Sequence, residues 1–319
     1  YLESGERDPE EIAFMEPQAG GACRAGNIYN LLQRVLYRMA EQGQTEYAQI
    51  PVISLNLMGE EKHTGFRITP GLLSGGIAAG CYGDLIMCLY QQVKPYEQNP
   101  GETDRIRSQV EKKLCESIRR HRNGRHTREK NYRYACEVFS KVPVKPGKKK
   151  RVGITGEIYM KYSKLGNDDI ESFLLRQGME PYSGGFVNYC LYLVDTERYK
   201  AEKYQHNPVM AKACAFVLHR LCEAQKHLLT VIGETDRFQT DLPFPELKEK
   251  VQGILAEGCN TGDGWLIAAE VIQYVEKGCG SVLILHPFGC LVSHVCERGI
   301  LQRLHARFPD VSIQTIEYD

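Results

Sequence analysis

The chain has 319 residues, of which 42% are hydrophobic, enough for two α/β units that each bury a core. Its 40 basic and 40 acidic residues cancel, which excludes a net field that would draw it to nucleic acid or to an anionic membrane. No apolar run approaches the thickness of a bilayer and no signal-peptide pattern opens the chain, so we expect a cytoplasmic protein.

The first α/β unit is expected over residues 1–98. It opens with polar residues and no initiator methionine, so we expect the chain to be part of a longer polypeptide. Strands are predicted over 12–15 and 51–57, and apolar residues recur at helical spacing over 28–39. Cys23 lies in the glycine-rich turn between the first strand and this helix.

Residues 99–150 are expected to form a charged helical segment that ends in a linker. The linker is predicted over 142–151, which is rich in proline, glycine and lysine. The basic patch at 119–133 is typical of a solvated helix surface, with contact to phosphates of a nucleotide or of coenzyme A as the alternative.

The second α/β unit is expected over 151–319, and the segment 278–291 is its most informative part. The four apolar residues Val282 to Leu285 follow a Gly-Cys-Gly break and stop at His286-Pro287, which predicts a strand buried on both faces of a parallel sheet. Gly289 then allows a sharp turn, and Cys290 stands where the strand gives way to a helix. A last strand is predicted over 311–316.

The chain contains twelve cysteines, which is an unusual number in the absence of an export signal. A reducing compartment keeps thiols free, so we expect buried side chains, metal ligands or reactive thiols rather than disulfides. No CxxC pair occurs, which disfavours zinc ribbons, thioredoxin sites and ferredoxin-type runs. Metal ligands would therefore have to come from loops that are distant in sequence.

Cys23, Cys190 and Cys290 share a context, because each follows an extended segment and a glycine. Ligands bind at the carboxyl ends of strands in open α/β sheets, and a helix N-terminus there favours a thiolate. Three such thiolates could hold a cubane iron–sulfur cluster. The simpler interpretation is three ordinary buried loop cysteines. Cys81 and Cys259 are weaker candidates because their contexts are less defined.

The other cysteines and the neighbouring histidines are expected to have structural roles. His286 and His294 are candidates for second-layer donors or a proton source, with ordinary buried or surface histidines as the simpler alternative. Packing or surface positions are predicted for Cys115, Cys136, Cys214, Cys222, Cys279 and Cys296.

Five ordered motifs resemble one known protein superfamily. Residues 21–29 (GACRAGNIY) resemble a "GPCRxGQY" segment, 156–167 (GEIYMKYSKLGN) a "GEIYxKYxxxGN" segment, and 264–270 a "GWLxxGE" helix. HPFGCLVSH at 286–294 is similar to "QPFGCLPNH", and IEYD at 316–319 to "IDYD". These segments belong to the 2-hydroxyacyl-CoA dehydratase, benzoyl-CoA reductase and double-cubane-cluster superfamily, in particular to its activase-associated members.

The resemblance implies stacked Rossmann-like domains with an iron–sulfur cluster between them. A partner activase, fused or separate, would use ATP to transfer low-potential electrons onto the cluster, which could pass them to a CoA thioester or another small substrate. By position, Cys23 and Cys290 correspond best to cluster ligands and Cys190 next, whereas Cys259 has no counterpart. The superfamily pattern has further cysteine-containing sequence upstream of Tyr1, so this chain alone could lack the cluster. Paired subunits are also typical of the group.

The sequence therefore favours an iron–sulfur redox module of two Rossmann-like units with parallel sheets. A cluster-free regulatory or nucleotide-binding module attached to an activase is the competing hypothesis, and a zinc-stabilised scaffold is the third. Catalysis does not follow from membership in such a group, because function depends on the site and not on the fold.

Overall fold

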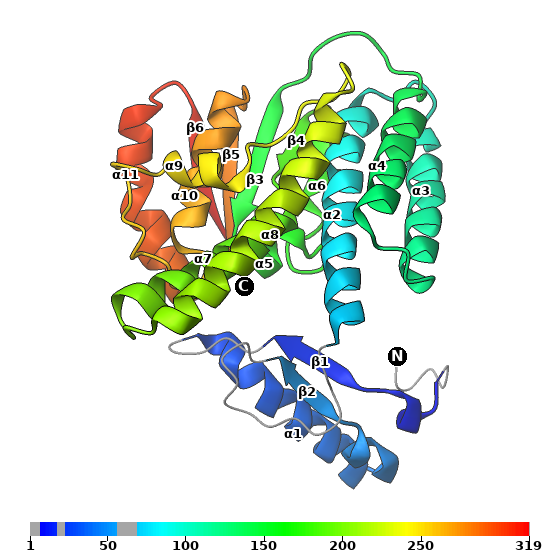
Figure 1. The fold of residues 1–319 in the computed structure, drawn as a ribbon, viewed down its shortest axis with the longest axis vertical. Coiled ribbons are helices and arrows are strands. Elements are labelled where there is room, and N and C mark those ends of the chain that lie inside the picture. The colour runs from blue at the N-terminus through cyan, green and yellow to red at the C-terminus, as the bar shows by residue number, and fades with distance from the viewer. Residues whose placement is uncertain (1–6, 18–22, 56–68, 319) are drawn as a thin grey trace. The chain divides into compact units, whose positions relative to one another are not determined.

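The computed structural model describes residues 7–17, 23–55 and 69–318. The protein is mixed α/β, with about 61% helix and two small parallel sheets, which confirms the predicted class at this level. The chain divides into two compact units, Tyr1–Ile68 and Thr69–Asp319 (Figure 1).

The first unit is built from a strand, a helix and a second strand that pairs in parallel with the first. These are β1 (Phe14–Pro17), α1 (Ile28–Glu41) and β2 (Val52–Leu55). Single 3₁₀ turns lie at η2 (Pro9–Glu11), η3 (Arg24–Asn27) and η4 (Thr45–Gln49). β1 begins two residues later than predicted because the amide of Ile12 still closes the turn of η2, donating to the carbonyl of Pro9. Residues 56 and 57 of the second predicted strand lie outside the described residues.

The second unit contains most of the helices. They are α2 (Pro70–Val93), α3 (Glu102–Arg119), α4 (Arg125–Ser140), α5 (Ile158–Tyr162), α6 (Ile170–Arg176), α7 (Phe186–Lys203), α8 (Pro208–Gly233), α9 (Phe244–Glu249), α10 (Gly264–Glu276) and α11 (Arg298–Arg307), with a 3₁₀ turn at η5 (Lys94–Tyr96). A π-helical turn, η6 (Ser293–Glu297), leads directly into α11. Turns of this kind are rare and are frequently found at functional sites.

The sheet of the second unit has four parallel strands in the order β4-β3-β5-β6. The strands are β3 (Arg151–Gly156), β4 (Glu180–Ser183), β5 (Ser281–Pro287) and β6 (Ser312–Tyr318). The chain moves from β3 to β4 on one side and then returns to add β5 and β6 on the other side of β3. The loops after β3 and β5 therefore leave the sheet in opposite directions, and the point between them is where open α/β sheets generally bind ligands.

Both faces of this sheet are covered, as the apolar run Val282 to Leu285 predicts. Val282 and Ile284 join the large core that also contains α10, whereas Leu285 packs with Met160 and Leu174 on the opposite face. Burial on both faces explains why β5 reads as a continuous apolar run rather than an alternating one.

The division of the chain at 68/69 differs from the predicted boundaries at 98/99 and 150/151. One apolar core extends from Ala78 of α2 through α3 and α4 to Ile313 of β6, so these helices belong to the second unit. The segment 142–151 has the composition of a linker but is held in place, because the amide of Lys145 donates to the carbonyl of Tyr96 at 2.7 Å. The proline, glycine and lysine residues of this segment therefore reflect its place at the surface and do not mark a boundary between units.

The segment Pro70–Tyr96, which contains α2, is long and apolar enough to cross a membrane by length and composition. This corrects the expectation that no apolar run reaches that length. Its mean hydropathy is 1.5, and 33% of the apolar window is buried inside the protein. The helix contributes Leu85, Leu89 and Val93 to the large core, and a core helix of a globular protein passes the same test.

Gly156 at the end of β3 lies too close to β5 to carry a side chain. Its φ is +132°, and a Cβ atom there would overlap the carbonyl oxygen of Leu285. Gly147 has a similar φ of +123°, but a Cβ atom at that position would meet nothing within 4 Å. A side chain at Gly147 would therefore cost only the free energy of the unfavourable backbone conformation, whereas one at Gly156 would also overlap the neighbouring strand.

We expect Gly156→Ala to destabilise the protein strongly and Gly147→Ala to destabilise it by about 1–3 kcal/mol, which is the cost of the strained backbone alone. Gly156→Ala should cost at least about 2 kcal/mol more, because the methyl group forces β3 away from β5. Urea unfolding of both variants measures the difference. Equal losses in the two variants would contradict the close approach of the strands.

Candidate functional site

The candidate site lies at the carboxyl ends of β3 and β5, where the strand order reverses. After β3, the amide of Glu157 donates to the carbonyl of Leu285 at 2.8 Å, which holds the start of this loop against β5. After β5, Gly289 adopts a φ of +70° and the amide of Cys290 donates to the carbonyl of Pro287 at 3.2 Å. The predicted glycine turn is therefore present, and it places Cys290 just beyond the sheet, half-buried.

Cys296 lies near two other cysteines of the second unit, Cys259 and Cys290. Cys259 is half-buried in the loop before α10, and Cys296 is buried in the turn η6. The pKa of the Cys296 thiol is raised to about 11 by burial first and then by the proximity of Cys259, with Cys290 among the further causes. Gly262 packs against this region, because a Cβ there would lie 2.7 Å from Cγ2 of Val292. Two segments distant in sequence, the loop before α10 and the stretch after β5, thus bring thiols close together.

Cys190 follows a strand, β4, and two glycines, as the sequence predicts. It lies inside α7 rather than at a strand end, because α7 begins at Phe186, directly after Gly185. Its pKa is raised to about 11 by burial first and then by the charges of Asp84 and Cys81. Its thiol neighbour is therefore Cys81, which is buried in α2.

Cys23 lies in the first unit, exposed, immediately before η3. The carbonyl of Cys23 accepts from the amide of Gly26 at 3.2 Å, so it belongs to the turn that precedes α1. The convergence of Cys23 with Cys290 stays a prediction.

All twelve cysteines are free thiols. The positions expected for the structural cysteines hold: Cys136 and Cys279 are buried, Cys115 is exposed, and Cys214 and Cys222 are half-buried on α8. Cys279 precedes β5, at the opposite end of the sheet from Cys290. Of the cysteines expected to have packing roles, Cys296 is the exception, because it lies beside two candidate ligands.

A buried ion pair joins two of the resemblance motifs at this edge of the sheet. Lys161 of α5 donates to both carboxylate oxygens of Glu270 of α10, at 2.7 and 2.8 Å, and Thr155 donates to the same carboxylate at 2.5 Å. The two charged side chains are only 4% and 3% exposed, so each needs the other. Sequence analysis missed this pair. The available signal was the isolated charge of Glu270 within an otherwise apolar helix.

A carboxylate from α2 holds the start of α7. Oδ1 and Oδ2 of Asp84 accept from the amides of Phe186 and Val187 at 2.7 and 2.9 Å. Burial raises the pKa of Asp84 to about 7, although these two hydrogen bonds act in the opposite direction. Gly185 is required beside it, because a Cβ there would overlap Oδ2 of Asp84.

Further buried acids surround the ion pair and leave little space. Asp263, before α10, has a pKa well above its usual range, chiefly because of burial and then because of Glu157 and Glu297. The cavity that Lys161, Asp263 and Glu270 line with their neighbours has a volume of about 10 Å³. That is the size of one water molecule, so this cavity does not admit an organic substrate.

The histidines flanking Cys290 differ in exposure. His286 is fully buried at the end of β5, and burial lowers its pKa. His294 is half-buried in η6, with Nε2 3.8 Å from a carboxylate oxygen of Glu317. His286 thus matches the predicted alternative of a buried histidine, and the partly exposed His294 comes closer to the alternative of a surface histidine.

The chain has no match among protein-family models, curated proteins or solved structures. The geometry of the second unit and the motifs of the sequence therefore carry the functional argument.

We expect Lys161→Met to destabilise the protein by about 3–5 kcal/mol, because it leaves the Glu270 carboxylate buried without its charge partner. The double variant Lys161→Met/Glu270→Gln should recover part of that loss, since it removes the orphaned charge as well. Lys164→Met is the matched control, because its pair with Asp169 is exposed and contributes at most about 1 kcal/mol. Urea unfolding at neutral pH measures the stability of Lys161→Met, of the double variant and of Lys164→Met. A double variant less stable than Lys161→Met would show that the unpaired Glu270 charge is not the cause of the loss.

Asp84 should make the protein more stable in mild acid than at alkaline pH. Its folded pKa of about 7 lies above the ordinary value of 3.8, so the folded state binds the proton more tightly. The free energy of unfolding should therefore fall as the pH rises from about 4 through 7. We expect Asp84→Asn to reduce the difference in unfolding free energy between pH 5 and pH 8.

The exposed Asp236 provides the control for this measurement. Asp236→Asn should leave the difference between pH 5 and pH 8 as it is in the unchanged protein. An Asp84→Asn variant that keeps the full difference would assign the pH dependence to other buried acids.

Proposed function

We propose that this chain is an iron–sulfur redox module that accepts low-potential electrons from an ATP-dependent activase. The observation that carries the proposal is the proximity of Cys296 to both Cys259 and Cys290, beyond the carboxyl end of β5. Thiolates are the ligands of iron–sulfur clusters, and this edge of a parallel sheet is where ligands bind.

The spacing of these thiols favours a cluster over a single zinc ion. Four thiolates 2.3 Å from one zinc ion lie about 3.8 Å apart in a tetrahedral site. Within the described residues, the three sulfur atoms do not form a group with all distances below 4.8 Å. In a cubane cluster each thiolate binds a different iron, which requires wider spacing. A scaffold stabilised by zinc at these thiols is therefore a weaker proposal than an iron–sulfur cluster.

Bound at this place, a cluster would supply a one-electron centre of low potential. The residues of the chain would hold it through thiolates and shape its surroundings. The turn around Gly289 offers backbone amides, and hydrogen bonds to cluster sulfur atoms tune the potential. Cys23 of the first unit and Cys190 of α7 remain proposed additional ligands.

We also infer that residues 151–319 are a Rossmann-like unit. The parallel order β4-β3-β5-β6 supports this, because it corresponds to the 2-1-3-4 order that opens the flavodoxin-like arrangement. An activase, fused or separate, would be the electron donor, and ATP would act only through it. A CoA thioester or another small substrate would be the acceptor, and two copies could pair as the superfamily does.

A cluster-free regulatory or nucleotide-binding module attached to an activase is the second candidate. The thiol pKa values favour it, because burial raises those of Cys190 and Cys296 to about 11. Such thiols are protonated at neutral pH, and ligation would have to displace their protons.

Anaerobic production of the full-length gene product separates the two. We expect a brown protein with several iron and sulfide ions per chain and a signal in electron paramagnetic resonance after reduction. Cys290→Ala, Cys259→Ala and Cys296→Ala should each lose at least half of the iron, because each removes one thiolate from the same cluster. Iron and sulfide analysis of the purified variants is the measurement.

Cys115→Ala is the matched control, because Cys115 is exposed on the charged helix α3. Its iron content should equal that of the unchanged protein. A colourless, metal-free product, or iron that is retained in all three test variants, would support the cluster-free module instead.

A further inference from the structure

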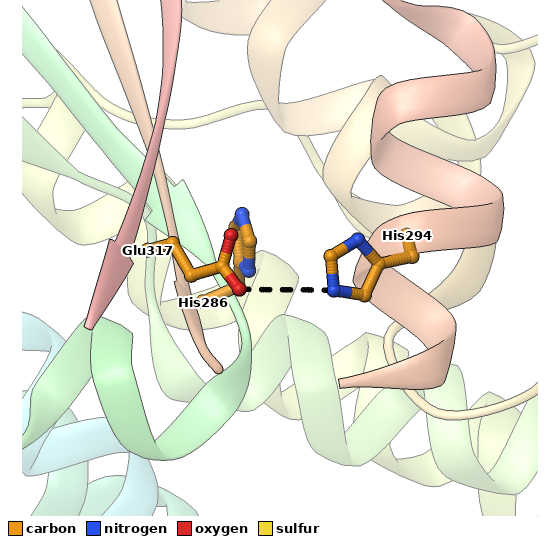
Figure 2. Close-up of side chains that lie close together, drawn as sticks. All are labelled: His286, His294 and Glu317. Carbon is orange, nitrogen blue, oxygen red and sulfur yellow. Dashed lines mark ion pairs between the residues drawn. The ribbon is translucent and has the colours of Figure 1, made fainter. Parts of the chain in front are cut away.

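Three side chains that the proposed cluster does not use converge at the end of β5. They are His286, His294 and Glu317, and their ligand atoms all lie within 4.8 Å of one another. Figure 2 shows the three side chains directed toward one another from β5, η6 and β6. The sheet register explains the first contact, because His286 lies directly opposite Glu317 in the parallel pair β5–β6.

His286 has the features of a metal ligand rather than of a packed core histidine. Its side chain is fully buried, and Nδ1 lies 3.4 Å from the carbonyl oxygen of Pro287. A proton on Nδ1 would be directed to that carbonyl and would leave a lone pair on Nε2. Within the described residues, Nε2 is buried and has no hydrogen-bond partner. A buried polar atom without a partner is costly, and a metal ion would satisfy it.

Glu317 is already oriented for the same purpose. One carboxylate oxygen accepts from Arg298 at 2.6 Å, and the other lies 3.8 Å from Nε2 of His294. A ligating carboxylate is commonly held by a hydrogen bond to its second oxygen. The positive charge of Arg298 opposes a cation, but Arg298 binds Oε2 of Glu317, whereas Oε1 is the oxygen that faces His294.

We propose that His286, His294 and Glu317 form a mononuclear site for a borderline divalent metal ion such as Zn²⁺. Two imidazoles and one carboxylate are the ligands of many catalytic zinc sites, which keep a fourth position open. His294 and Glu317 are 35% and 26% exposed, so that position faces solvent. Ligand atoms about 2.1 Å from a tetrahedral ion lie about 3.4 Å apart, so the side chains need to close by about 1 Å.

This site is separate from the proposed cluster. Its ligands are nitrogen and oxygen atoms, and no thiol of the described residues belongs to the group. Hard and borderline donors of this kind select zinc-class ions over iron–sulfur clusters. The site and the cluster can therefore fail independently.

Titration of the metal-free protein with Co²⁺, a spectroscopic substitute for Zn²⁺, tests the proposal. We expect one Co²⁺ per chain, visible bands typical of nitrogen and oxygen ligands, no thiolate-to-cobalt charge-transfer band, and displacement by Zn²⁺. His294→Ala and Glu317→Gln should weaken binding at least tenfold. His305→Ala, an exposed histidine in the last turn of α11, should leave affinity unchanged.

Melting of the variants without metal shows whether each is folded, and Cys290→Ala distinguishes the two sites. Co²⁺ binding that survives in Cys290→Ala supports the His/Glu site even where no cluster can be assembled. A charge-transfer band that disappears in Cys290→Ala would overturn the proposal, because it would assign the metal to thiolates. Absence of Co²⁺ binding, or equal affinities in His294→Ala and His305→Ala, would overturn it as well.

Discussion

The parallel pairing of β3 with β5 determines where every group of the candidate site lies. It fixes Gly156 against Leu285, and from that contact the two loops leave the sheet in opposite directions. The chain after β3 leads into α5, which places Lys161 in the interior. The turn after β5 places Cys290 just beyond the sheet. A side chain at position 156 would overlap Leu285 and prevent this close approach of the two strands.

Buried charge is the second organising feature of the second unit. The pair Lys161–Glu270 and the carboxylate of Asp84 connect elements that are far apart in sequence: α5 with α10, and α2 with α7. Each connection costs desolvation, and each is offset by specific hydrogen bonds rather than by apolar packing. The result is a polar interior next to the proposed ligands. A region of this kind specifies one arrangement more strictly than an apolar core does, since partial pairing is unfavourable.

The sequence predicts local features of this fold well and long-range ones poorly. The apolar run of β5, the turn at Gly289 and the position of Cys290 follow from neighbouring residues alone. The position of Cys190 inside a helix was not predicted, because the glycines before it did not show that α7 begins directly after Gly185. The partnership of Lys161 with Glu270 depends on strand order, which one sequence does not reveal. The relation of His286 to Glu317 depends on the register of β5 and β6 in the same way.

The π-helical turn η6 has a geometric consequence of its own. A turn of this type contains about one residue more than an α-helical turn, so positions before it are rotated by about 100° relative to an uninterrupted helix. His294 lies within that wide turn, whereas Arg298 begins the regular helix behind it. His294 and Arg298 are four residues apart, so they lie on the same face of the segment and contact opposite oxygens of the Glu317 carboxylate. The inserted residue changes instead the direction of Leu291 and Val292, which precede the wide turn, relative to the helix α11.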